Sequence, residues 1–378
     1  MSDLPRIAVI GCGSHAVQNL YPCFRLAVHN PPELVGAAIG DLAEGGAIGE
    51  LVACCDVDEA RARNCARDFG IGAVYTDHRE LLERERPDGV IVAMHPRLQP
   101  AIALDCLEAG ADVLVEKPPA ETAEDCLALR ETADGAGRQV MVGFMKRFSE
   151  PYRRAKAIAE RPAFGPLTAY EARWTFGVYP PRSVYDFLNG FGCHHLDLAR
   201  FFGGDVAWVM AARSSRMPGD AREWTPGALD LPMTGSVWRD MWELAEGREA
   251  PQEEAWAVLL GFESGAIGTL QINCLERINE RVAVTGHRHA VYVDEWRRVT
   301  AWTEGAETPE MWEPHDQVPL DALDPRHLHG FAGEVRHFVE CVRDRNRPAV
   351  TIDDGLAAIR LEEAIKRSVA EQAPVTVA

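Results

Sequence analysis

The chain of 378 residues is too long for one ordinary hydrophobic core and about right for two domains. Apolar residues make up 47% of it and charged residues 26%, the balance of a soluble globular protein. Its formal charge of −19 argues against nucleic acid or an anionic membrane as the main partner, because both need clustered Lys and Arg.

The N-terminus passes directly into an apolar run, without the longer apolar region of a signal peptide, and no apolar stretch approaches the length of a membrane span. The ten cysteines are scattered and form no CxxC pair. Several fall inside apolar runs, where a thiol behaves as a small buried hydrophobe. We therefore expect a reduced, cytoplasmic protein without a metal.

Strands and helices alternate in the first third of the chain. Apolar runs predict strands at 6–10, 51–56, 89–93, 113–115 and 140–143. Helices are predicted after the first strand to about residue 27 and at 59–69, 100–109 and 123–136. Strands separated by helices of this length predict βαβ crossovers and a doubly wound parallel sheet.

The pattern changes after residue 148. The predicted strands become longer, richer in Trp and Tyr, and lose the regular helices between them: 167–176, 206–213, 254–262, 266–274, 281–285 and 290–293. This is typical of an α+β domain with a large, mostly antiparallel open sheet. We expect domains at 1–147 and 148–378, with helices at 330–342 and 353–372 packing back on the body. The stretch 215–253 has no clear periodicity and reads as a long loop.

A glycine-rich turn follows the first strand and opens a helix. Gly11-x-Gly13-x-x-Ala16 stands in the context that a dinucleotide-binding fingerprint requires. Its glycines let the backbone approach a pyrophosphate, and the helix N-terminus supplies N–H donors and a favourable dipole. The turn predicts a Rossmann-type cofactor site.

The acid that should bind the adenosine ribose has two candidates. Asp56 ends the second predicted strand, but it lies 45 residues after Gly11 instead of about twenty, so we read about 30–50 as an insertion. Asp41 is the alternative, if residues 33–41 form the second strand. We favour Asp56, because a helix follows it at once. An acid there prefers NAD, while the nearby Arg61 and Arg63 keep NADP open.

Lys117 follows an apolar strand at the point where the chain turns into two prolines. The carboxyl edge of a parallel sheet is where ligands bind. A lysine there can act as a general acid or base when its surroundings lower its pKa. An exposed lysine in a Pro-rich turn is the alternative.

His194 and Asp197 lie three residues apart, on one face of a predicted helix. A histidine can take an alcohol proton while a hydride leaves the carbon, and an aspartate one turn away can bind substrate hydroxyls. The same pattern is common in helix caps and histidine-containing cores. Cys193-His194-His195 does not predict a metal site, because adjacent helical residues point apart and no second cluster of ligands supports one.

Together these motifs resemble the glucose–fructose oxidoreductase, inositol 2-dehydrogenase and MocA (Gfo/Idh/MocA) family. The ordered set runs from GxGxxA through Glu116-Lys117-Pro118 and Gly143-Phe144-x-x-Arg147 to Gly192-x-His194-x-x-Asp197. The C-terminal Gly330-Phe331-x-x-Glu334 extends the similarity over nearly the whole chain. The resemblance implies an N-terminal Rossmann domain, a C-terminal α/β domain whose open sheet often forms oligomer contacts, and NAD(P)-dependent chemistry on sugars, cyclitols and related polyols.

The resemblance also assigns roles. Lys117 and His194 match the catalytic residues, and Asp197 matches a substrate-contacting acid. The cofactor contacts expected are Gly11, Gly13, Ser14, His15, Ala16, Asp56, Ala93, His95, Pro96, Glu116, Lys117 and Arg147. Trp174, Tyr179, Tyr185 and Arg182 are further candidates for the sugar site, as stacking aromatics and an anion-binding group, or as ordinary packing residues.

Two positions depart from the family pattern. Gly190 stands where an acid often precedes the histidine by four residues, and Gln99 replaces a histidine found after the fourth strand. Asp186 is a possible substitute for the missing acid, and Lys117 would then carry more of the proton transfer. We expect a cytoplasmic NAD(P)-dependent dehydrogenase, a homodimer or homotetramer through the C-terminal sheet. The alternatives are an oxidoreductase that recycles a tightly bound cofactor and a non-catalytic NAD(P)- or sugar-sensing regulator.

Overall fold

The computed structural model describes residues 4–24, 48–175, 188–215, 254–273, 279–314 and 325–377. The chain forms two compact units. The first comprises Met1–Glu150 and Gln317–Ala357, and the second comprises Pro151–Asp316 and Ala358–Ala378. No helix in these described ranges is long and apolar enough to span a bilayer.

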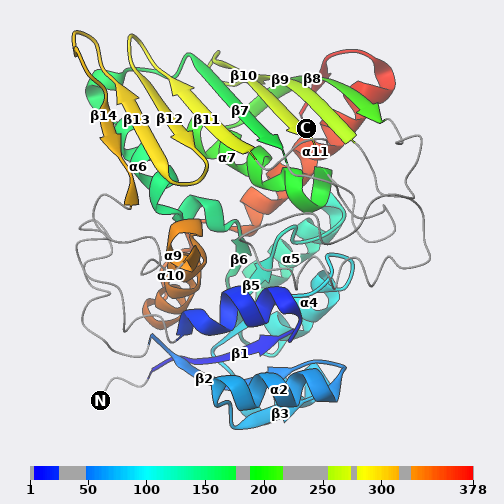
Figure 1. The fold of residues 1–378 in the computed structure, drawn as a ribbon. Coiled ribbons are helices and arrows are strands. Elements are labelled where there is room, and N and C mark those ends of the chain that lie inside the picture. The colour runs from blue at the N-terminus through cyan, green and yellow to red at the C-terminus, as the bar shows by residue number, and fades with distance from the viewer. Residues whose placement is uncertain are drawn as a thin grey trace, which may run out of the picture. The chain divides into compact units, whose positions relative to one another are not determined.

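The first unit is built on a six-stranded parallel sheet with the order β3-β2-β1-β4-β5-β6 (Figure 1). The strands are β1 (Arg6–Ile10), β2 (Glu50–Cys55), β3 (Ala73–Tyr75), β4 (Gly89–Val92), β5 (Asp112–Glu116) and β6 (Val140–Gly143). Every residue of β4, β5 and β6 is buried, as expected of a parallel sheet covered on both faces. The predicted doubly wound sheet is confirmed, with β3 as a strand that the sequence pattern did not predict.

Helices cover this sheet, and the best defined of them carry clear end signals. They are η1 (Ala16–Leu20), η2 (Tyr21–Phe24), α2 (Glu59–Phe69), α3 (His78–Glu85), α4 (Gln99–Glu108), α5 (Ala123–Ala136) and η6 (Met145–Phe148). The side chain of Asp58 caps α2 by accepting from two main-chain N–H groups, and Gly70 ends the helix with a φ of 69°. These caps explain why the predicted bounds 59–69 are correct.

Two helices from late in the chain belong to the first unit. They are α9 (Pro325–His329) and α10 (Phe331–Asp344). The apolar stripe of α10, including Phe331, Val335 and Phe338, shares one core with β1, β2 and α2. Burial of this stripe therefore attaches α10 to the same face of the sheet as the glycine-rich turn.

The second unit contains a nine-stranded sheet, counted over the ranges that the structure describes. Its order is β14-β13-β12-β11-β7-β10-β9-β8-β15, and of its strand pairs only β7 and β10 are parallel. The strands are β7 (Ala169–Thr175), β8 (Val206–Ser215), β9 (Glu254–Phe262), β10 (Ile267–Asn273), β11 (Asn279–Thr285), β12 (Ala290–Asp294), β13 (Arg298–Trp302), β14 (Glu310–Trp312) and β15 (Val375–Thr376). The predicted mostly antiparallel sheet is confirmed, and β13, β14 and β15 extend it.

One face of this sheet is covered and the other is open. Side chains of β7 and β10 alternate between buried and exposed. The buried ones pack with apolar residues of α6 (Glu150–Ala159), α7 (Cys193–Gly203) and the second half of α11 (Ile352–Glu371). The two short helices η7 (Pro162–Phe164) and η8 (Leu188–Gly192) complete the unit, and η8 leads directly into α7.

Candidate active site

The turn after β1 requires glycine and leaves room for a ligand. Gly11 adopts a φ of +110°, and a Cβ there would lie 2.2 Å from the main-chain oxygen of Ala93. A Cβ on Gly13 would meet no heavy atom of the described chain within 4 Å. Helical backbone begins at Ser14 and continues through His15 into η1. An open space at a helix N-terminus fits the pyrophosphate of a dinucleotide.

Asp56 follows β2 directly and contacts this turn. Its Oδ2 accepts a hydrogen bond of 2.8 Å from the main-chain N–H of Cys12, and its Oδ1 accepts one of 2.9 Å from Asp58. An acid in this position can bind the hydroxyls of the adenosine ribose. The alternative, Asp41, and most of the predicted insertion at 30–50 lie outside the described residues.

The turn after β4 forms the next part of the same sheet edge. Ala93 follows β4, and its N–H donates to the oxygen of Ile10 at 2.9 Å. His95 is half-buried and accepts from the N–H of Arg97 at 3.2 Å through Nδ1, and Pro96 is buried. Of these predicted cofactor contacts, Ala93 lies next to the glycine turn. Its main-chain oxygen occupies the space that a Cβ on Gly11 would need.

A buried carboxylate ends β5. Glu116 Oε1 lies 3.1 Å from Nε2 of His15, whose ring packs edge-on against Phe331 of α10 at 5.6 Å. Asn19 bonds the other ring nitrogen at 3.2 Å. Burial by itself raises the pKa of Glu116, but His15 and Lys117 more than offset this, and the pKa lies below its ordinary value. The site therefore holds an ionised carboxylate beside the lysine.

Lys117 occupies the position just beyond β5, half-buried at the edge of the sheet. Its N–H donates to Oε2 of Glu116 at 3.1 Å, and its bond to Pro118 is cis. The main-chain oxygens on either side of it, those of Glu116 and Pro118, both accept from Nε2 of the buried Gln99 at 2.8 Å. Gln99 thus fixes the backbone that carries Lys117, a role that its departure from the family pattern did not indicate.

Glu334 on α10 is a residue of this site that sequence reasoning did not assign a role. Its side chain is fully buried, and neither carboxylate oxygen has a hydrogen bond among the described residues. Burial raises the pKa of Glu334 well above its ordinary range, and the charge of Glu116 raises it further, whereas Lys117 opposes them. The sequence signal that could have identified Glu334 is an acidic residue inside the apolar stripe of Phe331, Val335 and Phe338.

Glu116 and Glu334 therefore titrate in opposite directions. The pKa of Glu116 is lowered by His15 and Lys117, while that of Glu334 is raised by burial and by the charge of Glu116. The ionised form is therefore favoured at Glu116 and the protonated form at Glu334. The edge of β5 accordingly brings together two carboxyl groups of opposite tendency beside Lys117.

Arg147, a further predicted cofactor contact, lies in η6. Its guanidinium forms an ion pair of 3.0 Å with Asp354, at the start of α11, and both side chains are largely buried. Asp354 also accepts from the N–H of Thr351 at 2.9 Å. The charge of Arg147 is thus compensated within the first unit, and a cofactor contact of this residue remains a prediction.

The second unit places His194 in the first turn of α7 and Asp197 about one turn later, and both side chains are buried. The ring of Trp174 lies 6.5 Å from that of His194, edge-on, and 5.1 Å from that of His195. Trp174 is 3% exposed, so it belongs to the core that supports the histidines. The candidates Tyr179, Arg182 and Tyr185, together with Asp186, lie outside the described residues.

The buried carboxylate of Glu280 lies beside the adjacent histidine, His195. Glu280 Oε1 lies 3.6 Å from Nε2 of His195, and its carboxylate also accepts from Tyr152 and Trp296. Burial and the charge of Glu280 raise the pKa of Tyr152 well above its ordinary value. The sequence signal was an acid in the buried register of β11, in line with Val282 and Val284.

Two family models match the chain. Residues 5–144 match the model described as an oxidoreductase family with an NAD-binding Rossmann fold, and residues 185–377 match its C-terminal alpha/beta domain.

Individual relatives and structures extend this similarity. The chain is 33% identical over 174 residues to inositol 2-dehydrogenase 2 of Saccharopolyspora erythraea, which covers 46% of this chain and 51%, about half, of that protein. It is 25% identical over 371 residues to scyllo-inositol 2-dehydrogenase (NAD(+)) of Bacillus subtilis, covering 97% of this chain and 93% of that one. An oxidoreductase domain protein from Kribbella flavida shares the fold, with a TM-score of 0.76 at 22% identity over 100% of both chains.

Proposed function

The chain belongs to the Gfo/Idh/MocA family of NAD-binding oxidoreductases, and on that premise we propose that it is a dehydrogenase of a sugar, cyclitol or related polyol. It transfers a hydride between a secondary alcohol or ketone of this substrate and the nicotinamide of NAD, with NADP as a second possible cofactor. The two relatives are both inositol dehydrogenases by name, which supports a cyclitol or a sugar of similar size.

The surroundings of Lys117 carry this proposal. The lysine lies at the carboxyl edge of a parallel sheet, where ligands bind, and beside the ionised Glu116. Gln99 fixes its backbone by donating to the main-chain oxygens of the residues before and after it. We assign Lys117 the transfer of the hydroxyl proton, because a positioned lysine can accept it as the carbon loses its hydride. The carboxylate of Glu116 stabilises the protonated lysine that results.

The residues of the first unit suit the cofactor. When bound, NAD would accept or supply the hydride. Gly11, Gly13 and the N–H groups from Ser14 onward would hold its pyrophosphate, and Asp56 would bind the adenosine ribose. The open space at Gly13 and the carboxylate at the end of β2 support these assignments.

His194 is our second catalytic candidate, and Asp197 is a candidate for binding substrate hydroxyls. Both side chains lie one helical turn apart at the start of α7. The edge-on contact with Trp174 limits the orientation of the His194 ring. An imidazole in a restricted orientation suits proton transfer to or from one defined hydroxyl.

The test is a panel of inositols, aldoses and their keto forms, assayed for nicotinamide absorbance with NAD and with NADP. We expect turnover of at least one polyol or sugar, with preference for NAD. Cofactor binding without turnover across the whole panel would contradict the proposal and favour a sensing role. Nicotinamide absorbance in the purified protein without added cofactor would point to internal recycling instead.

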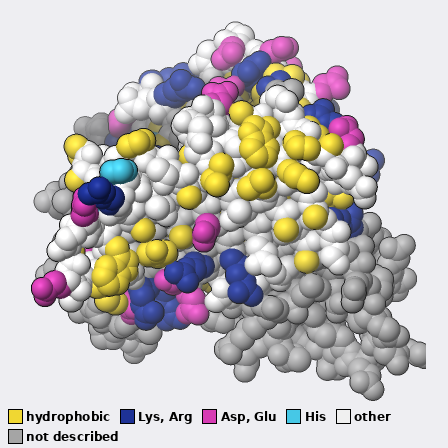
Figure 2. All heavy atoms as spheres, turned by 90° about the horizontal axis from the view of Figure 1, so that it is seen from above, with side chains coloured by type: hydrophobic (Ala, Val, Ile, Leu, Met, Phe, Trp, Pro, Cys, Tyr) yellow, Lys and Arg dark blue, Asp and Glu magenta, His cyan; other side chains and the backbone are white. Residues whose placement is uncertain are grey.

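We also propose that the enzyme forms a homodimer or homotetramer through the open face of the second-unit sheet. A depression of about 1030 Å³ lies on this face. Figure 2 shows hydrophobic side chains gathered on this face, with charged side chains among and around them. One cross-strand row runs from the apolar Met210 and Leu259 through Glu171 to Tyr292. An exposed face that combines apolar and charged side chains can pair with a second copy of itself.

We further propose that the enzyme acts in the cytoplasm. All nine cysteines of the described ranges are buried free thiols, the state that a reducing compartment preserves. Cell fractionation with an antibody to the native chain tests this assignment, and enrichment in a secreted or membrane fraction would contradict it.

A further inference from the structure

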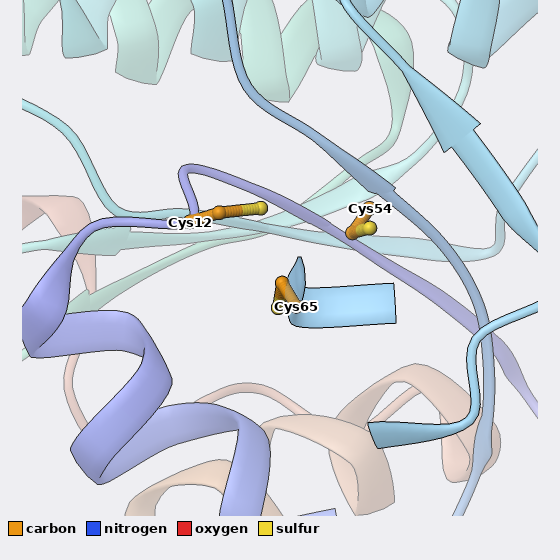
Figure 3. Close-up of side chains that lie close together, drawn as sticks. All are labelled: Cys12, Cys54 and Cys65. Carbon is orange, nitrogen blue, oxygen red and sulfur yellow. The ribbon is translucent and has the colours of Figure 1, made fainter. Parts of the chain in front are cut away.

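Three cysteines that are distant in the sequence meet behind the glycine-rich turn. Cys12 comes from the turn itself, Cys54 from β2 and Cys65 from α2 (Figure 3). Their sulfur atoms all lie within 4.8 Å of one another, and all three side chains are buried. Neither the cofactor nor the proposed catalytic chemistry uses these thiols.

The spacing of the sulfurs is close to that of a metal–thiolate site. Three thiolates bonded to one cation at about 2.3 Å are about 4 Å apart, whether the geometry is trigonal or tetrahedral. Only small side-chain shifts separate this arrangement from the observed one, in which no pair of sulfurs exceeds 4.8 Å. The described chain has no other group of three ligand side chains this close together.

The surroundings offer a choice of coordination number. The hydroxyl of Tyr21, which is fully buried, lies 3.3 Å from Sγ of Cys12, and the main-chain oxygen of Cys55 lies 3.8 Å from the same sulfur. Three thiolates alone satisfy Cu⁺, whereas Zn²⁺ needs a fourth ligand, for which the Tyr21 hydroxyl is a weaker donor than Cys, His or a carboxylate. Apolar neighbours such as Val9 and Ala62 enclose the cluster and exclude harder, oxygen-seeking cations.

We propose that Cys12, Cys54 and Cys65 form a binding site for one thiophilic d¹⁰ cation, Cu⁺ or Zn²⁺. Binding replaces the thiol protons, which are released to solvent, and involves no change of oxidation state. The cation would tie the glycine turn to β2 and α2. This turn also holds Asp56 through the N–H of Cys12, so the site would brace the adenosine half of the cofactor site.

Ordinary packing is the competing explanation, because free cysteines are often buried as small hydrophobes. Cys106 and Cys126 provide matched controls. Both are fully buried in helices of the same unit, on α4 and α5, and neither belongs to the cluster.

The test uses the reduced full-length chain, stripped of metal and titrated in separate arms with Zn²⁺ and, under anaerobic conditions, with Cu⁺ against a competing chelator. We expect the chain to retain one ion after desalting in at least one arm. Bound Cu⁺ should give ultraviolet thiolate–metal absorption, and the ion-bound chain should melt at a higher temperature than the metal-free chain. The substitutions C12S, C54S and C65S should each weaken binding by at least about a hundredfold, more than the loss of an outer partner costs. C106S and C126S should bind as the wild type does.

Retention of no ion in either arm would overturn the proposal, as would equal binding by the cluster and control variants. A further measurement uses only the wild-type chain, so it remains valid if the cysteine variants fail to fold. Brief thiol alkylation followed by mass spectrometry should show the three cluster cysteines protected by the ion, with Cys106 unaffected. Labelling of the cluster that is independent of the ion would equally exclude a metal site.

Discussion

Gln99 donates from one amide nitrogen to the main-chain oxygen of Glu116, at 2.8 Å, and the same nitrogen reaches the oxygen of Pro118. These are the carbonyls on either side of Lys117. A glutamine 18 residues earlier, at the start of α4, therefore sets the backbone conformation of the proposed catalytic lysine. The substitution of a histidine by Gln99 is thus compatible with an active enzyme.

Removal of the two hydrogen bonds from Gln99 should lower both the turnover and the stability of the enzyme. Q99A leaves two buried carbonyl oxygens without their donor, at a cost of about 1–3 kcal/mol each in the free energy of unfolding. Q99H should lie between the wild type and Q99A, because one imidazole N–H cannot donate well to both oxygens. Urea unfolding and kcat on the panel substrate measure the two effects. The control Q139A, at a half-buried position before β6, should change neither. A Q99A enzyme with wild-type kcat would show that the hydrogen bonds of Gln99 do not position Lys117.

Lys117 itself should control the chemical step. K117A is expected to lower kcat by a factor of about 10²–10⁴, the usual contribution of a positioned proton-transfer group. NAD binding, measured by calorimetry, should change far less, because the glycine turn and Asp56 remain. K156A provides the control, since Lys156 lies on α6 and pairs with Glu160. Wild-type turnover of K117A on the true substrate would rule out the assigned role.

Glu334 should make the protein less stable as the pH rises. Because the folded-state pKa of this acid is raised, its stabilising contribution is complete below the ordinary carboxyl pKa and is lost as the pH increases toward the raised value. E334Q stays neutral, so it should match the wild type in acid and become relatively more stable at neutral and alkaline pH. Thermal unfolding across this pH range, with the exposed α5 variant E131Q as control, measures the difference. Parallel pH profiles for E334Q and the wild type would contradict the expectation.

Asp56 should govern the choice between NAD and NADP. Its carboxylate would repel a 2′-phosphate and accept hydrogen bonds from a free ribose hydroxyl. D56N should reduce the ratio of kcat/KM for NAD to that for NADP by about tenfold, equivalent to about 1.4 kcal/mol. The neighbouring D58N also removes a carboxylate charge but keeps a good N-cap side chain on α2, so it should leave this ratio unchanged. If D56N and D58N show the same cofactor ratio, Asp56 is not the ribose acid.

A charge on the open sheet face should dissociate the proposed oligomer. Met210 is 46% exposed beside the apolar end of the depression, so M210E would bury an unpaired carboxylate in the contact. Sedimentation velocity should then show a smaller species. The control M311E changes a methionine that is 59% exposed on β14, outside the depression, and should leave the mass unchanged. A wild-type chain that sediments as a monomer would exclude the proposal directly.

Local signals in the sequence determined much of this fold. The strands of the first unit are short apolar runs, and α2 ends where Asp58 and Gly70 predict, because capping and left-handed backbone depend on a few neighbouring residues. The glycine turn, Asp56 and Lys117 could be placed at one sheet edge for the same reason: in a parallel sheet, the residue just after each apolar run lies at the carboxyl edge.

Contacts between distant residues decided what surrounds that edge. Glu334 approaches Glu116 and Lys117 only because α10 buries its apolar stripe on the first sheet, and Gln99 reaches Lys117 only because β4 and β5 are neighbours. The cysteine cluster arises in the same way, from a turn, a strand and a helix that no spacing rule connects. Hydrogen bonding and burial energies depend on which groups meet after packing, and they leave no local periodicity in the chain. The sequence therefore determined the position of Lys117, whereas the tertiary structure decided which groups hold it and set the charges around it.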